Sequence, residues 1–224
     1  MLSSQHLATL LHTQQYAAVP SYLASLSNAE RRRAGVLLGE TLLPRLSNAQ
    51  FWEAFATIVA VDRKAYLGTF LKAASRLIRE GKLTVANPHF EAFCATATPT
   101  DCRKILEALL PYICDPDMGQ RLLTLCPLES DAQTLSLLCH THTLICDYLI
   151  FQHLRRLDPA SPEIRATAIA IIKRRGERSY SVAYLIQQYF GLEALPCTFS
   201  RHIESYALSR LEGNFAEWRH LLQP

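Results

Sequence analysis

The chain has 224 residues, of which 49% are hydrophobic and only 19% are charged. This composition excludes extensive disorder, because a disordered chain needs a larger share of charged and polar residues. The formal net charge of +3 is too small to require a polyanionic partner. Residues 1–150 contain 13 Lys and Arg against 13 Asp and Glu, whereas residues 151–224 contain 10 against 7.

Two phrases near the N-terminus predict where helices begin. Ser27-Asn-Ala-Glu30 and Ser47-Asn-Ala-Gln50 both have the pattern of a capping box. In this motif the serine hydroxyl accepts from the amide three residues on, and the Glu or Gln side chain reaches back to the serine amide. The two phrases share Leu-Ser-Asn-Ala at an interval of 20 residues. This similarity indicates either a trace of an internal repeat or two similar caps.

The clearest amphipathic segment covers residues 62–80. Its apolar residues recur at helical spacing and form one face of a helix, while Lys72, Arg76 and Arg79 lie on the other face. Gly81 follows the last periodic residue, as is typical just beyond a helix C-terminus. Further along the chain, prolines separate the apolar periods, and Pro111 should end or kink the helix that contains it. The almost wholly apolar segment 164–172 predicts a buried helix.

Taken in chain order, the periodicity predicts helices near 4–17, 20–26, 28–43, 48–60, 62–80, 88–95, 100–114, 116–125, 130–139, 142–157, 162–175, 179–190, 200–212 and 214–222. The short connections imply antiparallel neighbours. We therefore expect an all-α fold made of consecutive antiparallel helical hairpins, forming a single helical domain over 1–224. It is either an α-α superhelix of the HEAT or tetratricopeptide kind or an irregular multi-helix bundle, since no residue signature of a named repeat recurs.

One cluster has the residue types of a metal site. Cys139, His142 and Cys146 would share a face if this segment were one continuous helix, and Cys with His suits zinc. The alternative interpretation is a turn at His140–Thr141 with Thr141 as a cap and the cysteines in the core. The chain has seven cysteines, an odd number, and most of them lie in apolar patterns, which favours reduced, buried thiols.

Basic residues suggest a second kind of site. Two clusters lie within the region 155–178 and could contact phosphates beside nearby tyrosines, and their members are Arg155, Arg156, Lys173, Arg174, Arg175 and Arg178. Cations at helix C-termini are an alternative explanation, because they complement the helix dipole.

The sequence favours a noncatalytic helical protein-interaction module or scaffold. No phosphate-binding glycine loop is present, and no catalytic residue or cofactor is indicated. Cys94 with His89 is a weak candidate for a thiol–imidazole pair, at a spacing that does not share a helix face. The alternatives are a nucleic-acid-binding helical-repeat protein that uses the basic region 155–178 and a metal-binding helical enzyme or sensor. The favoured partner is another protein or a second copy of the chain, and nucleic acid is the alternative.

No segment is long and apolar enough to span a membrane, and the first residues lack the basic and apolar parts of a signal peptide. We therefore expect a cytoplasmic protein.

Overall fold

The computed structural model describes residues 2–141 and the isolated residues 143, 146, 149, 150, 152, 153, 162 and 166. Its contacts divide the chain into two compact units, residues 1–127 (unit 1) and 128–224 (unit 2). All regular elements of the described residues are helical, which confirms the predicted all-α class. Within this part of the chain, no helix has the length and apolar character that crossing a bilayer requires. The single domain over 1–224 stays a prediction.

Unit 1 contains eight α-helices within its described residues, and unit 2 begins with a ninth. Their bounds are α1 Leu2–His12, α2 Ala18–Ser25, α3 Asn28–Leu37, α4 Asn48–Val61, α5 Arg63–Arg79, α6 Pro88–Ala95, α7 Pro99–Leu109, α8 Pro116–Leu125 and, in unit 2, α9 Asp131–His140. Three short turns of other helix types join them: η1 (Leu38–Leu42, π), η2 (Leu43–Arg45, 3₁₀) and η3 (Leu110–Tyr112, 3₁₀). The predicted helices beyond residue 141 fall almost wholly outside the described residues.

Local side-chain chemistry sets most of these boundaries. Both predicted capping boxes are present, since Ser27 accepts from Glu30 N and Ser47 accepts from Gln50 N, with the reciprocal bonds also formed. A capping box that the sequence analysis missed begins α7, where Thr98 pairs with Asp101. As expected, α7 stops just before Pro111, at Leu109.

The first helix is shorter than the predicted 4–17. It ends at His12 because Gln14 adopts a left-handed backbone with φ of 58°. The amide of Gln15 then donates to Leu10 O, and that of Gln14 donates to Leu11 O. These two bonds form a Schellman motif. The same pair of bonds closes α5 around Gly81, whose φ is 69°.

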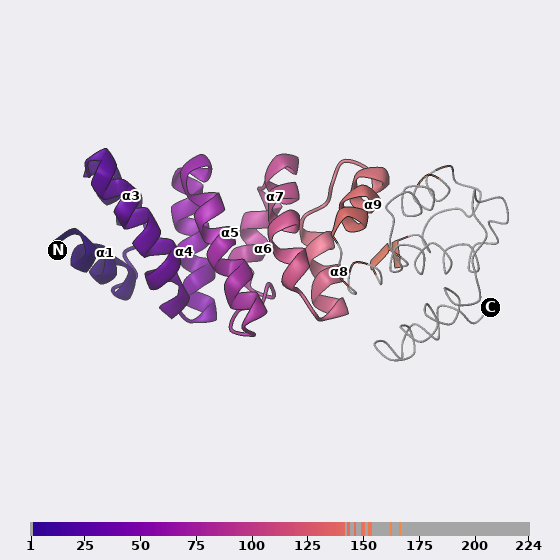
Figure 1. Cartoon of the computed structure of the whole chain (residues 1–224), viewed down its shortest axis with the longest axis horizontal. Helices are drawn as coiled ribbons and strands as arrows, with labels where there is room; N and C mark the ends of the chain where they lie inside the picture. The colour runs from indigo at the N-terminus through magenta and orange to yellow at the C-terminus, as the bar shows by residue number, and fades with distance from the viewer. Residues whose placement is uncertain are drawn as a thin grey trace. The chain divides into compact units, whose positions relative to one another are not determined.

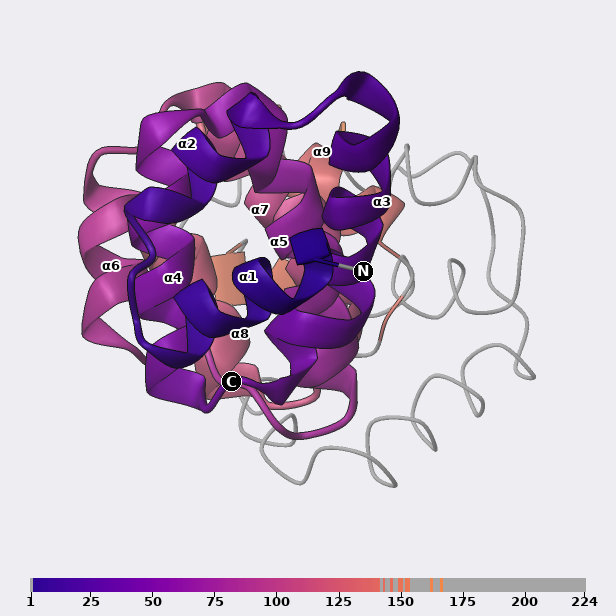
Figure 2. The same cartoon turned by 90° about the vertical axis from the view of Figure 1, so that its left-hand side faces the viewer.

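The helices of unit 1 alternate between two layers (Figures 1 and 2). Going along the chain, α2, α4, α6 and α8 contact one another in succession, and α5 lies between η1 and α7 in the other layer. Asp62 alone joins α4 to α5, and it caps the end of one helix and the start of the next. The repeated Leu-Ser-Asn-Ala phrase begins α3 and α4, which belong to different layers. This placement favours two similar caps over a hairpin repeat.

The core between the layers is aromatic. Trp52 and Phe55 of α4 meet Phe70 of α5 and Phe90 of α6, and all four side chains are fully buried. The indole Nε1 of Trp52 donates to Thr84 O at 2.7 Å, so its polar atom is satisfied inside the core. Burial of this cluster fixes α4, α5 and α6 relative to one another.

The predicted helix 28–43 changes its winding before it ends. After Leu37 the chain makes the π turn η1, in which Leu43 N–H donates to Leu38 O five residues back. Pro44 follows, and it has no amide hydrogen with which to continue the α-helical pattern. The π turn brings Gly39 against α5, where a β-carbon at residue 39 would lie 3.0 Å from Thr69 Cγ2.

The two glycines of this region should respond differently to alanine. A β-carbon at Gly35 would meet no atom within 4 Å, whereas one at Gly39 would press on Thr69. We expect Gly35→Ala to raise the free energy of unfolding by about 0.5–1 kcal/mol, because alanine loses less backbone entropy in a helix. Gly39→Ala should gain less or lose stability. Urea unfolding of both variants measures the difference, and a larger gain for Gly39→Ala would contradict the close approach of η1 to α5.

Candidate functional site

The predicted nucleic-acid residues cannot be placed. Arg155, Arg156, Lys173, Arg174, Arg175 and Arg178 all lie outside the described residues. The nucleic-acid prediction for this region therefore stays a prediction.

The predicted metal cluster does not lie on one continuous helix. The helix α9 ends at His140, where the amide of Thr141 donates to Leu137 O and Leu138 O. Beyond this turn the hydroxyl of Thr143 accepts from Cys146 N, so Thr143 takes the capping role that was expected of Thr141. The side chains of Cys139 and His142 are not described, and no set of three metal-binding side chains occurs in the described part of the chain. The metal prediction itself stays untested, but the helical spacing that suggested it is absent.

Three cysteines of unit 1 form a buried cluster. Cys94, Cys102 and Cys126 are each less than 5% exposed, and Cys126 Sγ lies 3.6 Å from Cys94 Sγ. The hydrogen bond to Cys94 and burial both raise the pKa of the Cys126 thiol, and burial raises that of Cys102. The thiols of Cys102 and Cys126 are therefore protonated at neutral pH and are poor nucleophiles. Cys94 is buried while His89 is exposed, so this arrangement gives no support to a catalytic pair.

A groove of unit 1 lies between α3–η1 and α5, and we call it the α5 groove. It encloses about 750 Å³ and is lined by Arg32, Gly35, Val36, Gly39, Glu40, Thr41, Thr69, Lys72, Ala73 and Arg76. Arg32, Gly35 and Val36 of α3 and Gly39 of η1 recur at helical spacing and line one side of the groove. Two glycines and Ala73 leave the floor of the groove without large side chains. Val36 is 59% exposed and lines this groove.

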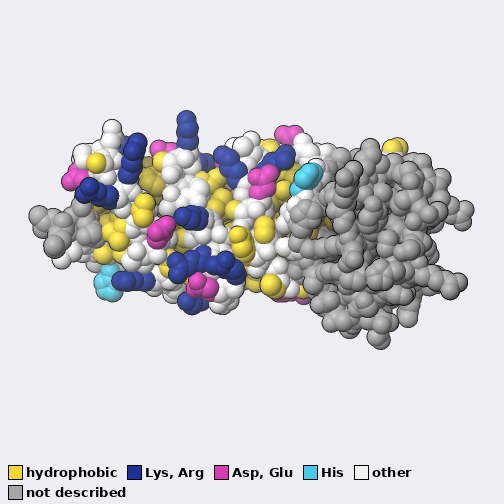
Figure 3. Space-filling view, viewed as in Figure 1, with side chains coloured by type: hydrophobic (Ala, Val, Ile, Leu, Met, Phe, Trp, Pro, Cys, Tyr) yellow, Lys and Arg dark blue, Asp and Glu magenta, His cyan; other side chains and the backbone are white. Residues whose placement is uncertain are grey.

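Cations follow the groove along α5. Lys72, Arg76 and Arg79 occupy successive turns on one side of the helix and form what we call the basic stripe. Lys72 Nζ lies 3.3 Å from Glu40 Oε1, and Arg76 Nε lies 3.0 Å from Glu80 Oε1. Hydrogen bonds from Lys82 and Arg76 lower the pKa of Glu80. These carboxylates neutralise the stripe only in part. Figure 3 shows Lys and Arg side chains spread over the α3–α5 part of one face, with hydrophobic patches between them.

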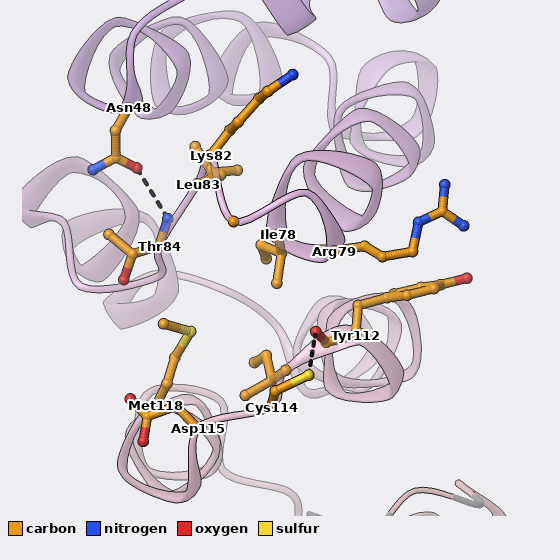
Figure 4. A pocket seen from close by; sticks show the side chains of 12 residues that line it. Asn48, Ile78, Arg79, Lys82, Leu83, Thr84, Tyr112, Cys114, Asp115 and Met118 are labelled. Carbon is orange, nitrogen blue, oxygen red and sulfur yellow. Dashed lines mark hydrogen bonds between the residues drawn. The ribbon is translucent and has the colours of Figure 1, made fainter.

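A second opening lies at the end of the basic stripe, and we call it the η3 pocket. It encloses about 440 Å³ between the end of α5, η3 and the start of α8. Figure 4 shows Ile78 and Met118 pointing into it, while Arg79 and Tyr112 extend side by side at its edge. Arg79 Cζ lies 6.0 Å from the Tyr112 ring centre, a cation–π distance. The loop from Lys82 to Thr84 closes another side, where Thr84 N donates to Asn48 Oδ1.

The groove and pocket together form a mixed basic and apolar surface. Five cations line them: Arg32, Lys72, Arg76, Arg79 and Lys82. The nearby carboxylates are Glu40, Glu80 and Asp115, the last of which caps α8. Unit 1 as a whole has 13 Lys and Arg against 10 Asp and Glu in residues 1–127. No protein-family model, curated protein or solved structure matches the chain, so its function is inferred from this surface.

Proposed function

We propose that the chain is a noncatalytic helical protein-interaction module and that a partner protein docks in the α5 groove. The observation that carries the proposal is the exposed Val36 at a groove whose floor is made of glycine and alanine. Exposed apolar side chains in a concave setting gain free energy when a partner removes them from water. A floor without bulky side chains lets a partner backbone approach closely.

Three further features support this function. The turn η1 that follows α3 packs against α5, and residues of all three elements line one groove, as in other helical arrays that bind partners along a groove. The thiols of Cys102 and Cys126 are buried and their pKa values are raised, which is typical of cysteines with a packing role. The π turn at the edge of the groove is also of a kind found often at functional sites.

The chain offers a matched pair of positions for the test. Val36 and Val61 are exposed to nearly the same extent, at 59% and 61%, but only Val36 lines the groove. A photo-crosslinking amino acid is placed at either position of the full chain, which is then irradiated in its native cell extract. We expect discrete protein adducts from position 36 that position 61 does not give. Equal adduct patterns from the two positions, or none from position 36, would refute docking in the groove.

A further inference from the structure

The partner of this surface can be specified by its chemistry. We infer that the α5 groove and the η3 pocket receive an acidic amphipathic helix of another protein, with its carboxylates over the basic stripe and an apolar residue in each opening. This inference rests on the proposed function, since it names the kind of partner that the groove binds. The partner is a protein other than this chain, and the segment that binds is a helix.

The sign of the charge comes from the stripe. Lys72 and Arg76 are largely exposed, and each is bound to a carboxylate that is itself partly open to water. Arg79 contacts no carboxylate in the described structure but lies beside the Tyr112 ring. Glutamates or aspartates of a partner could therefore add to an unbalanced set of cations. Charge complementarity of this kind sets partner choice and speeds association.

The same charges argue against a second copy of the chain. In a two-fold dimer the same surface patch meets itself. Docking through the α5 groove would then bring Lys72, Arg76 and Arg79 of one copy close to those of the other. Such like-charge contacts are unfavourable.

Nucleic acid fits the surface less well than an acidic helix. Nonspecific single-strand binding uses several aromatic platforms in a row beside uncompensated cations. Among the large hydrophobic side chains of the described residues, Tyr112 is the one aromatic residue that is exposed, and its ring lies beside Arg79.

The geometry of α5 sets the spacing of the partner's anchors. Lys72 borders the groove and Arg79 borders the pocket, seven residues further along the same helix. This corresponds to about 10.5 Å at 1.5 Å per residue. A helix lying along the stripe would therefore place two apolar residues about seven positions apart, one beside Val36 and one beside Tyr112 at the edge of the η3 pocket. The open space at Gly35, where a β-carbon would meet no atom within 4 Å, permits the close approach that such a helix needs.

The test is a selection of displayed random 16-residue peptides on the immobilised full chain. Peptides that also bind the double variant Lys72→Glu/Arg76→Glu are removed. We expect the retained peptides to be rich in Asp and Glu and to carry two apolar residues about seven positions apart. Their affinity, measured by fluorescence anisotropy, should fall at least about tenfold in the double variant and weaken as salt is raised.

A matched control separates local from general electrostatics. Arg103 pairs with Glu107 at the same spacing as Arg76 with Glu80, but Arg103 lies on α7 and lines neither opening. The variant Arg103→Glu/Lys104→Glu changes the net charge by the same amount and should leave peptide binding within about twofold. The Lys72→Glu/Arg76→Glu variant should in turn bind lysine-containing versions of the peptides, which shows that it is folded.

Three outcomes would overturn the inference: selected peptides that are neutral or basic, equal losses in the two double variants, or a single-stranded RNA oligonucleotide that binds more tightly than every selected peptide. These results are distinguishable from a failure of the proposed function. If any of these outcomes occurs together with position-specific adducts at Val36, the groove still binds a protein, but the partner is not an acidic amphipathic helix. The absence of adducts at Val36 would remove the groove itself as a docking site.

Discussion

Replacing Trp52 with alanine should lower the free energy of unfolding by about 4 kcal/mol. Its side chain is fully buried, and its ring lies 4.2 Å from that of Phe90 and 5.3 Å from that of Phe55. Alanine would leave a cavity at the junction of α4, α5 and α6, and it would also leave Thr84 O without the indole donor. The cost therefore combines lost burial, lost ring contacts and an unpaired carbonyl.

Urea unfolding followed by far-ultraviolet circular dichroism measures this loss. Trp52→Phe keeps a ring but loses the hydrogen-bond donor, so it should cost about 1–2 kcal/mol. It should therefore remain folded at urea concentrations that unfold the alanine variant. Val61→Ala, at an exposed position, should change the stability by less than about 0.5 kcal/mol. A loss below about 1 kcal/mol for Trp52→Ala would contradict the central place of this cluster.

Replacing Asp101 with asparagine should lower the free energy of unfolding by about 2 kcal/mol at neutral pH. The carboxylate accepts from Thr98 N and Oγ1 at the start of α7, and its Oδ2 lies 3.1 Å from Arg63 Nη1 of α5. Arg63 also donates to Thr96 O and lies over the Phe93 ring. Asp101 is buried, so its charge depends on these partners, and asparagine would leave Arg63 without its counter-ion.

The loss in the Asp101 variant should depend on pH. Burial raises the pKa of Asp101, but the hydrogen bonds from Thr98 and the charge of Arg63 outweigh it and hold the pKa below its usual value. A carboxyl group whose pKa is lowered by folding stabilises the protein above its unfolded pKa, near 3.9, and loses this effect as the pH falls through the folded value. The difference between wild type and Asp101→Asn should therefore be constant above about pH 5 and shrink below about pH 4.

The exposed pair Arg103–Glu107 provides the reference for this measurement. Glu107→Gln should cost less than about 0.5 kcal/mol at any pH, because water screens an exposed ion pair. Unfolding curves of the three proteins between pH 2 and pH 7 test the prediction. A gap for Asp101→Asn that stays constant down to pH 2 would show that the charge of Asp101 is not what stabilises α7 against α5.

Features with a local cause could be predicted from the sequence. The boxes at Ser27 and Ser47 need only residues three positions apart, and the stop at Gly81 needs only a residue that tolerates positive φ. The end of α1 could not be predicted in this way, because Gln14 takes a left-handed conformation without a glycine or asparagine to indicate it. The box at Thr98 was missed because its third residue is Asp101 instead of the usual Glu or Gln.

The candidate surface depends on contacts that the sequence does not show directly. Lys72, Arg76 and Arg79 were correctly assigned to the polar face of their helix, but the groove exists only because the π turn brings Gly39 against Thr69 of α5. The helical spacing of Arg32, Gly35, Val36 and Gly39 could have indicated this surface. Two glycines inside the predicted helix 28–43 lower its stability, and glycines kept at such positions usually have a packing or functional role. The metal prediction assumed one helix across residues 139–146, whereas the predicted helices 130–139 and 142–157 had already placed a turn at His140–Thr141, where α9 ends.

The most direct test of a docking groove is to fill it. Gly35→Trp adds a large ring over open space, because a β-carbon at Gly35 meets no atom within 4 Å. The measurement is the yield of protein adducts from a photo-crosslinker at position 36, compared between the Gly35→Trp variant and the chain that keeps Gly35. A docking groove predicts that the adducts disappear in Gly35→Trp while its unfolding transition is retained. Adducts of unchanged identity and yield in a folded Gly35→Trp chain would contradict it.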